Sequence, residues 1–108
     1  MPASLPVDLN DSALHEIGVS PVYSTTGSFT LALDNHGEAV HVHLHLDDDL
    51  SRVARIDANN HYVDADAVRP VDVQVAEVSA PVTGKLKIVT GYGAETEYVE
   101  VTVDPTAK

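Results

Sequence analysis

Apolar and polar side chains alternate along most of this chain, and the clearest alternation runs from Ala39 to Asp47. Valine or leucine occupies every second position (Val40, Val42, Leu44, Leu46), and the positions between them hold His41, His43 and His45. Successive side chains of a strand point to opposite faces. The segment is therefore predicted to be a half-buried strand, with an apolar inner face and an outer stripe formed by these three histidines, the histidine stripe.

The same period of two recurs elsewhere. Further strands are predicted over residues 28–34, 61–63, 71–75, 84–92 and 98–103. The four residues Asn35–Glu38 have the composition of a turn, in which Asn35 and Gly37 suit a positive φ. Because this turn joins the strand over 28–34 to the histidine strand, the two are predicted to form a β-hairpin.

Other segments leave alternatives open. Residues 1–11 contain Pro2 and Pro6 and are expected to be extended and frayed. The next segment is either a helical turn over residues 11–17 that ends at Gly18, or a strand over 14–19. Residues 50–56 form either a short helical turn or a strand. Pro21 restricts the residues that follow it to an edge strand or a turn.

Six to eight short strands with almost no helical periodicity predict an all-β fold, an antiparallel, immunoglobulin-like β-sandwich. At 108 residues the chain is expected to form a single domain over 1–108, with flexible ends at 1–11 and 104–108. Gly91-Tyr92-Gly93 lacks the third glycine and the helix of a nucleotide-binding loop. A tight bend with positive φ at its glycines is expected there, with Tyr92 filling the end of the sandwich.

Charge narrows the possible partners. The chain has 17 acidic residues against 6 Lys and Arg, a formal charge of −11, and no cysteine. Disulfides and thiolate metal sites are excluded. Nucleic-acid binding needs a basic patch. Lys85 with Lys87 is the one local excess of positive charge and is too little for such a patch, so no nucleic-acid partner is expected. An acidic, lysine-poor surface is similar to that of proteins from salt-loving archaea, in which molar salt shortens the Debye length to about 3 Å.

The ends of the sequence bear on the cellular location of the protein. Met1–Pro6 has neither the basic nor the apolar region of a signal peptide, and no apolar run approaches the length of a membrane span. A cytoplasmic location is expected for the chain as given. The tail Asp104–Lys108 has the composition of a linker, so the alternative is a longer, membrane-anchored or cell-surface protein whose anchor lies outside this chain.

The histidine stripe is the main candidate for site chemistry, because neutral imidazole is a common metal ligand. Neighbouring histidines of the stripe lie about 6.5–7 Å apart along a strand, so two of them can share one zinc or copper ion, but not all three. A third ligand would come from His36, Asp47, His61 or Glu100. Three ligands and a water would make a hydrolytic site. The alternatives are a solvated sheet face and a pH sensor.

No catalytic motif accompanies the stripe. The Asp47–Asp49 run does not have the spacing of a calcium-binding EF-hand loop. No Gly-x-Ser-x-Gly elbow is present, and Ser28, Ser51 and Ser79 lie in no distinctive context. The chain is therefore predicted not to be an enzyme.

Three segments, residues 28–46, 59–63 and 84–95, resemble a family of small acidic haloarchaeal proteins. More broadly, the chain is similar to immunoglobulin-like sandwich domains appended to archaeal membrane and surface proteins. The resemblance implies the sandwich fold and an association with a membrane complex or cell envelope, and it implies no active residues. The cysteine pair and core tryptophan of immunoglobulin domains proper are missing.

The function predicted from these observations is a non-catalytic protein-interaction or assembly module. Exposed edge strands carry unpaired backbone groups that can join another chain, so a protein partner or self-association is expected at the strand over 71–75 or at the terminal strands. The alternative is a metal-binding domain, for zinc or copper, that uses His41, His43 and His45.

Overall fold

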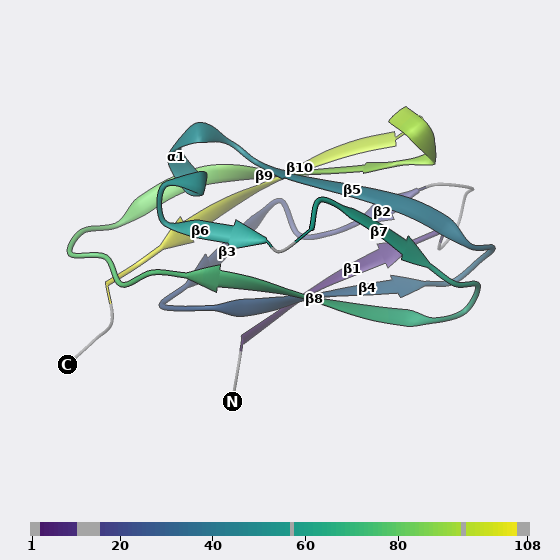
Figure 1. Ribbon diagram of the computed structural model, residues 1–108, viewed down its shortest axis with the longest axis horizontal. Coiled ribbons are helices and arrows are strands. Elements are labelled where there is room, and N and C mark those ends of the chain that lie inside the picture. Colours follow the sequence, from purple (N-terminus) through teal and green to yellow (C-terminus); the bar gives the residue numbers. More distant parts are fainter. Residues whose placement is uncertain (1–2, 11–15, 57, 94, 106–108) are drawn as a thin grey trace.

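The computed structural model describes residues 3–10, 16–56, 58–93 and 95–105, and it shows two five-stranded sheets packed face to face (Figure 1). Sheet A has the order β2 (Ile17–Gly18), β1 (Ala3–Leu9), β4 (Phe29–Asn35), β8 (Val68–Val75), β6 (Ala54–Ile56). Sheet B has the order β3 (Val22–Thr25), β10 (Glu95–Val103), β9 (Val82–Thr90), β5 (Val40–Leu46), β7 (Asn60–Val63). The predicted β-sandwich is confirmed.

Most neighbouring strands are antiparallel, as expected, and two pairs are parallel. Strand β1 runs parallel to β4 in sheet A, and β3 runs parallel to β10 in sheet B. Each parallel pair brings together segments that are far apart in the sequence, and local alternation carries no information about such pairing.

The core consists of the inward-pointing residues of both sheets. Its fully buried large side chains include Leu5, Leu9, Leu31, Leu33, Leu44, Leu86 and Ile88. Along β4 the burial alternates without a break, and along β5 Val40, Val42 and Leu44 are buried. The period of two therefore predicted correctly which face of these strands points inwards.

The N-terminal segment is extended, as predicted, but its described residues are not frayed. Residues 3–9 form β1, whose Leu5, Val7 and Leu9 are at most 2% exposed. Prolines exclude a helix more strongly than they exclude a strand, and Pro6 lies at an exposed position between the buried ones. The partner that makes β1 a strand is β4, about 26 residues further along the chain.

The predicted hairpin is wrong. Strand β4 pairs with β1 and β8 in sheet A, whereas β5 pairs with β7 and β9 in sheet B. The segment between them crosses from one sheet to the other. Positive φ is found not at Asn35 or Gly37 but, among the described residues, at Asn10 and Asp66 (both 55°) and at the predicted bend, Gly91 (62°) and Gly93 (98°).

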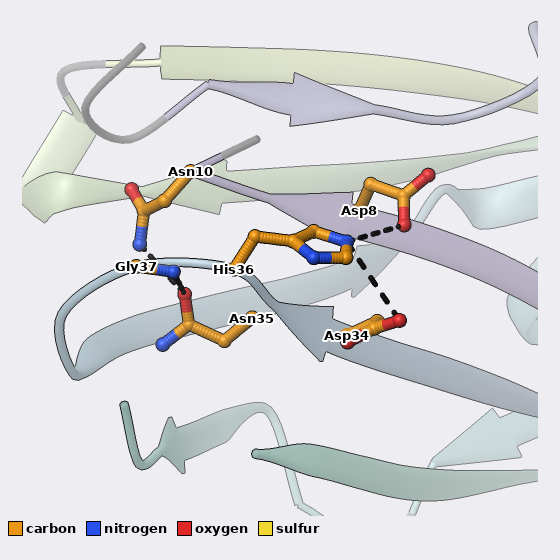
Figure 2. A network of polar contacts seen from close by, with 6 residues as sticks. All are labelled: Asp8, Asn10, Asp34, Asn35, His36 and Gly37. Atoms are coloured by element: carbon orange, nitrogen blue, oxygen red, sulfur yellow. Dashed lines mark hydrogen bonds and ion pairs between the residues drawn. The ribbon is translucent and has the colours of Figure 1, made fainter. Parts of the chain in front are cut away.

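A buried amide holds this crossover. Asn35 is 1% exposed. Its side-chain nitrogen donates to the carbonyl oxygens of Glu38 (2.7 Å), Asp64 (3.1 Å) and Val63 (3.4 Å). Its side-chain oxygen accepts from the backbone nitrogen of Gly37 (3.0 Å) and from the amide of Asn10 (2.8 Å), as Figure 2 shows. One side chain thus ties together the β4–β5 and β7–β8 connections and the end of β1.

Both alternatives for residues 50–56 are partly realised, since helix α1 (Asp48–Ser51) precedes strand β6. Asp47 caps α1, because its carboxylate accepts from the backbone nitrogens of Leu50 (2.9 Å) and Lys85 (2.8 Å). A Cβ on Gly84 would lie 2.7 Å from the Cβ of Leu50, so α1 can pack on β9 only where glycine stands. In the described part of the chain, no helix is long and apolar enough to cross a membrane.

The structure tests only part of the alternatives predicted for residues 11–19. Residues 11–15 lie outside the described residues, and they include Leu14, at which the alternative strand is predicted to begin. The short strand β2 and the edge position of β3 after Pro21 agree with the second alternative and with the restriction that proline imposes.

Candidate functional site

The histidine stripe lies on the outer face of sheet B, where the alternation predicts it. Strand β5 runs between β9 and β7, and His41 and His45 are exposed while His43 is half-buried. His41 lies opposite Tyr62 of β7, with ring centroids 4.9 Å apart and the rings tilted by 60°. His45 lies opposite Lys87 of β9.

His61 cannot serve as a third ligand for the stripe, because it points to the other side of the sheet. It is 7% exposed and lies opposite the buried Val42. Its Nε2 lies 2.8 Å from the carbonyl oxygen of Ala58, and its Nδ1 accepts from the guanidinium of Arg69 at 3.3 Å. A carbonyl only accepts and a guanidinium only donates, so both ring nitrogens are used as in a neutral imidazole.

The other three proposed ligands are also separated from the stripe. His36 follows β4 and lies with sheet A. Asp47 uses both carboxylate oxygens to cap α1 and to bind the backbone of β9. Glu100 lies on β10, opposite Lys85 and two strands away from β5. Among the described residues the stripe does not form a cluster of three converging ligands, and metal binding by His41, His43 and His45 stays a prediction.

The histidine stripe is part of a larger surface, which we call the B face. The B face consists of the outward-pointing side chains of the five strands of sheet B. Its central rows contain His41, His43, His45, Tyr62, Lys85, Lys87, Val89, Tyr98 and Glu100. Tyr62 and Tyr98 are 50% and 52% exposed, and Val22 at the β3 edge is 60% exposed.

The charge of the B face is opposite to that of the chain. By the alternation, the outward positions of its five strands hold two lysines, Lys85 and Lys87, and one carboxylate, Glu100. Glu95 and Glu97 at the start of β10 are also exposed, but they stand in register with the inward-pointing residues. The chain as a whole carries −11. Lys87 lies between His45 and Tyr98 in one row across the sheet, so positive charge, imidazole and phenol are adjacent there.

A second group of polar side chains lies on the outer face of sheet A (Figure 2). Asp8 of β1 and Asp34 of β4 are directly opposite each other in the parallel pair. The Nε2 of His36 lies 3.0 Å from Asp8 Oδ1 and 3.7 Å from Asp34 Oδ2. The ligand atoms of all three lie within 4.8 Å of one another, and this group is the Asp8–Asp34–His36 cluster. Sequence reasoning missed it, because the register between β1 and β4 leaves no local signal.

The edges of the sheets correct the predicted interaction strands. The segment Val73–Val75 of β8 is covered by β6, so only the preceding part of β8 is open on that side. The C-terminal strand β10 lies inside sheet B, between β3 and β9. Of the two terminal strands, only β1 lies near an edge, with β2 covering Asp8 and Leu9.

Two of the three serines considered for catalysis, Ser28 and Ser51, have structural partners. Ser28 Oγ accepts from the backbone nitrogen of Val75 at 2.9 Å, and Ser51 Oγ donates to the carbonyl of Asp48 at 3.1 Å. Burial raises the pKa of Tyr23, against a smaller lowering by a hydrogen bond with Thr25, so this phenol stays neutral at physiological pH. Tyr23 packs against Phe29 with ring centroids 4.9 Å apart. These groups support the fold.

Three surface hollows in the described part of the chain lie away from the B face. One is lined by residues 51–55 and 74–76, a second by Ser28–Thr30 and residues 72–75, and a third by Ile56, Ala58, His61 and residues 69–72. None of these three brings a serine, a histidine and a carboxylate together, although the third contains His61 and Asp72.

Comparison with known proteins places the chain by its sequence. The profile of DUF7524, a family of unknown function, matches residues 5–108. The chain belongs to this family. Because the match covers nearly the whole chain, both sheets of the sandwich and both groups described above lie within the family region. The search of curated proteins finds no match.

The fold is shared with several solved structures. SSP-19, an MSP-domain protein like family member of Caenorhabditis elegans, is 18% identical with a TM-score of 0.64, over 78% of this chain and 94% of that one. The CupB2 chaperone of Pseudomonas aeruginosa is 12% identical with a TM-score of 0.61, over 82% of this chain and 54% of that one. A PapD-like domain of human CEP192 is 11% identical with a TM-score of 0.56, over 100% and 84%. These similarities establish the immunoglobulin-like sandwich.

Proposed function

We propose that this chain is a non-catalytic protein-interaction module that binds an acidic segment of a partner protein on the B face. The observation that carries the proposal is the reversal of charge on this face. Two lysines and three imidazoles face outwards there with one carboxylate, although the chain has 17 acidic residues in 108.

The side chains of the B face also suit protein contact. Tyrosines are enriched in interfaces because they bring a large, rigid contact area at a small entropic cost. Tyr62 and Tyr98 are each about half exposed and lie on opposite sides of the β5–β9 pair. A partner with carboxylates would be attracted by Lys85 and Lys87, whereas the acidic surface of the rest of the protein would repel it.

Strand addition at the sheet edges, which the sequence suggested, has less support. Each edge is short or interrupted: β1 contains Pro6, the open part of β8 contains Pro70, β3 begins after Pro21, and β7 has four residues. Proline cannot donate to a neighbouring strand, and short or proline-containing edges are the usual protection against strand addition. Binding of the partner at an edge strand is therefore kept as one of the outcomes that the test below distinguishes.

The fold neighbours are compatible with a module of this kind, since one carries the name of a chaperone. We further propose that the acidic surface adapts the chain to molar salt, as in haloarchaeal proteins. Attachment to a membrane would depend on a segment outside this sequence.

The proposal is tested by site-specific photo-crosslinking in the native host. A photoreactive phenylalanine at Tyr98 probes the B face, and one at Ser4 probes the outer face of sheet A. The protein captured from Tyr98 is identified, produced pure and titrated against two charge reversals. Lys87→Glu should weaken its binding about tenfold or more, because it places a carboxylate against a carboxylate. Arg55→Glu on sheet A makes the same change in net charge and should alter binding less than about twofold.

Two results would overturn the proposal. One is a partner that binds the Lys87→Glu and Arg55→Glu variants equally well. The other is crosslinking from Ser4, or from a probe on an edge strand, in place of Tyr98, which would place the partner on the outer face of sheet A or at that edge.

A further inference from the structure

The Asp8–Asp34–His36 cluster places two carboxylates against each other without a described lysine or arginine in contact. Asp8 and Asp34 are exact cross-strand partners in the parallel β1–β4 pair, and their charges lie on the same outer face of sheet A. Like charges directly opposite on neighbouring strands destabilise a sheet. In a chain of charge −11 this repulsion adds to that of the whole surface. A cation at this position would remove it.

The imidazole of His36 points at both carboxylates, and the backbone holds it there. The backbone nitrogen of His36 donates to the carbonyl of Leu9 at 2.9 Å, which fixes the turn after β4 to the end of β1. On one side of His36, Asn35 is buried and fully hydrogen-bonded; on the other, a Cβ on Gly37 would lie 2.8 Å from the Cβ of Asn10. The three donors therefore come from elements that are tied together, not from a loose loop.

We propose that Asp8, Asp34 and His36 form a binding site for a divalent transition-metal ion, for which Zn²⁺ is the best probe. Imidazole and carboxylate are both ligands of zinc, at about 2.0–2.2 Å, which puts two ligand atoms of a tetrahedral ion about 3.3 Å apart. In the structure Nε2 lies 3.0 Å and 3.7 Å from the two carboxylate oxygens. The ligand atoms of all three lie within 4.8 Å of one another, so binding would need only side-chain rotations that bring them closer together.

The site is open to solvent on one side. The side chains of Asp8, Asp34 and His36 are 47%, 42% and 39% exposed, so water or a donor from another molecule can complete the coordination. The metal would also join β1 to β4 at the end of their pairing. Because β1 has only the two-residue β2 on its other side, this link would be expected to stabilise the N-terminal strand.

The experiment is a Zn²⁺ titration of the full chain, purified without a histidine tag, at pH 7.5, where an ordinary imidazole is mostly neutral. Two-dimensional NMR of the imidazole rings reports each of the histidines separately, so the cluster and the histidine stripe are distinguished in one sample. Calorimetry gives the stoichiometry and affinity, and thermal unfolding with and without Zn²⁺ gives the stabilisation.

The expected result is that His36 responds first, at about one equivalent, and that Zn²⁺ raises the melting temperature. Asp34→Asn and Asp8→Asn keep the side-chain shape, and each should lower the affinity about tenfold or more, since each removes a charged ligand. Asp72→Asn removes a carboxylate from the same outer face of sheet A without touching the cluster, and it should leave the affinity unchanged.

The proposal is overturned if the NMR signals of the His36 ring do not change when Zn²⁺ is added to folded wild-type protein. It is also overturned if Zn²⁺ changes only the signals of His41, His43 and His45. It is also overturned if Asp34→Asn and Asp72→Asn change the affinity equally, because the carboxylates would then act only through their total charge. None of these outcomes depends on the partner proposed for the B face.

Discussion

Replacing Asn35 should cost more stability than any other polar-to-alanine change in the described chain. Its side chain makes five hydrogen bonds, two of them as acceptor, to the crossover and to Asn10. A typical hydrogen bond contributes about 1 kcal/mol net, and a buried group left unpaired costs about 1–3 kcal/mol. Some of the freed carbonyls lie in partly exposed connections and regain water. Asn35→Ala should therefore lower the free energy of unfolding by about 3 kcal/mol.

A second variant separates hydrogen bonding from volume. Asn35→Asp has nearly the same shape and keeps both acceptor contacts, but it cannot donate to the three carbonyl oxygens of Glu38, Val63 and Asp64. It also puts a charge into a site that is 1% exposed. At pH 7 Asn35→Asp should be destabilised at least as much as Asn35→Ala, which is the opposite of what side-chain volume alone predicts.

The assay is urea unfolding followed by circular dichroism at constant, molar salt. A loss of about 3 kcal/mol corresponds to a fall in melting temperature of about 12–20 °C for a domain of this size. Asn59→Ala is the matched control, because Asn59 is exposed and its backbone carbonyl, not its side chain, binds Leu44. The reasoning is refuted if Asn35→Ala and Asn59→Ala differ by less than about 0.5 kcal/mol, or if Asn35→Asp is more stable than Asn35→Ala.

Three further predictions concern other parts of the fold. Gly84→Ala should lower stability by about 1–3 kcal/mol and speed amide exchange in α1, since the new Cβ would overlap Leu50 and the carboxylate of Asp47. Asp47→Asn, followed by the same two measurements, should cost about 1 kcal/mol, because the amide keeps only one of the two acceptor oxygens of the cap. Dilution from about 2 M to about 0.05 M KCl should lower the melting temperature, because unscreened repulsion among 17 acidic residues grows as the Debye length increases; an unchanged melting temperature would contradict the proposed adaptation to salt.

The histidine stripe illustrates how far local patterning reaches. Alternation placed His41, His43 and His45 on the outer face of their strand, and it placed Val40, Val42 and Leu44 in the core. It could not show that His61, which also lies on a strand of sheet B, points inwards to Arg69. Whether a given side chain points inwards or outwards depends on the register of its strand with the neighbouring strand. That register pairs residues that are far apart in the sequence.

The chain by itself determined the strands with clear alternation, such as β4, β5, β9 and β10, but not β1. It also determined which side chains of β4 and β5 are buried, the bend at Gly91–Gly93 and the strongly acidic character of the surface. These features follow from the geometry of a single strand or from composition. Only the tertiary structure decided that β4 and β5 belong to different sheets, that Asp8 meets Asp34 and His36, and that sheet B presents a face with one carboxylate. Pairing between distant strands is selected by burial of the whole core together, and no single segment contains that information.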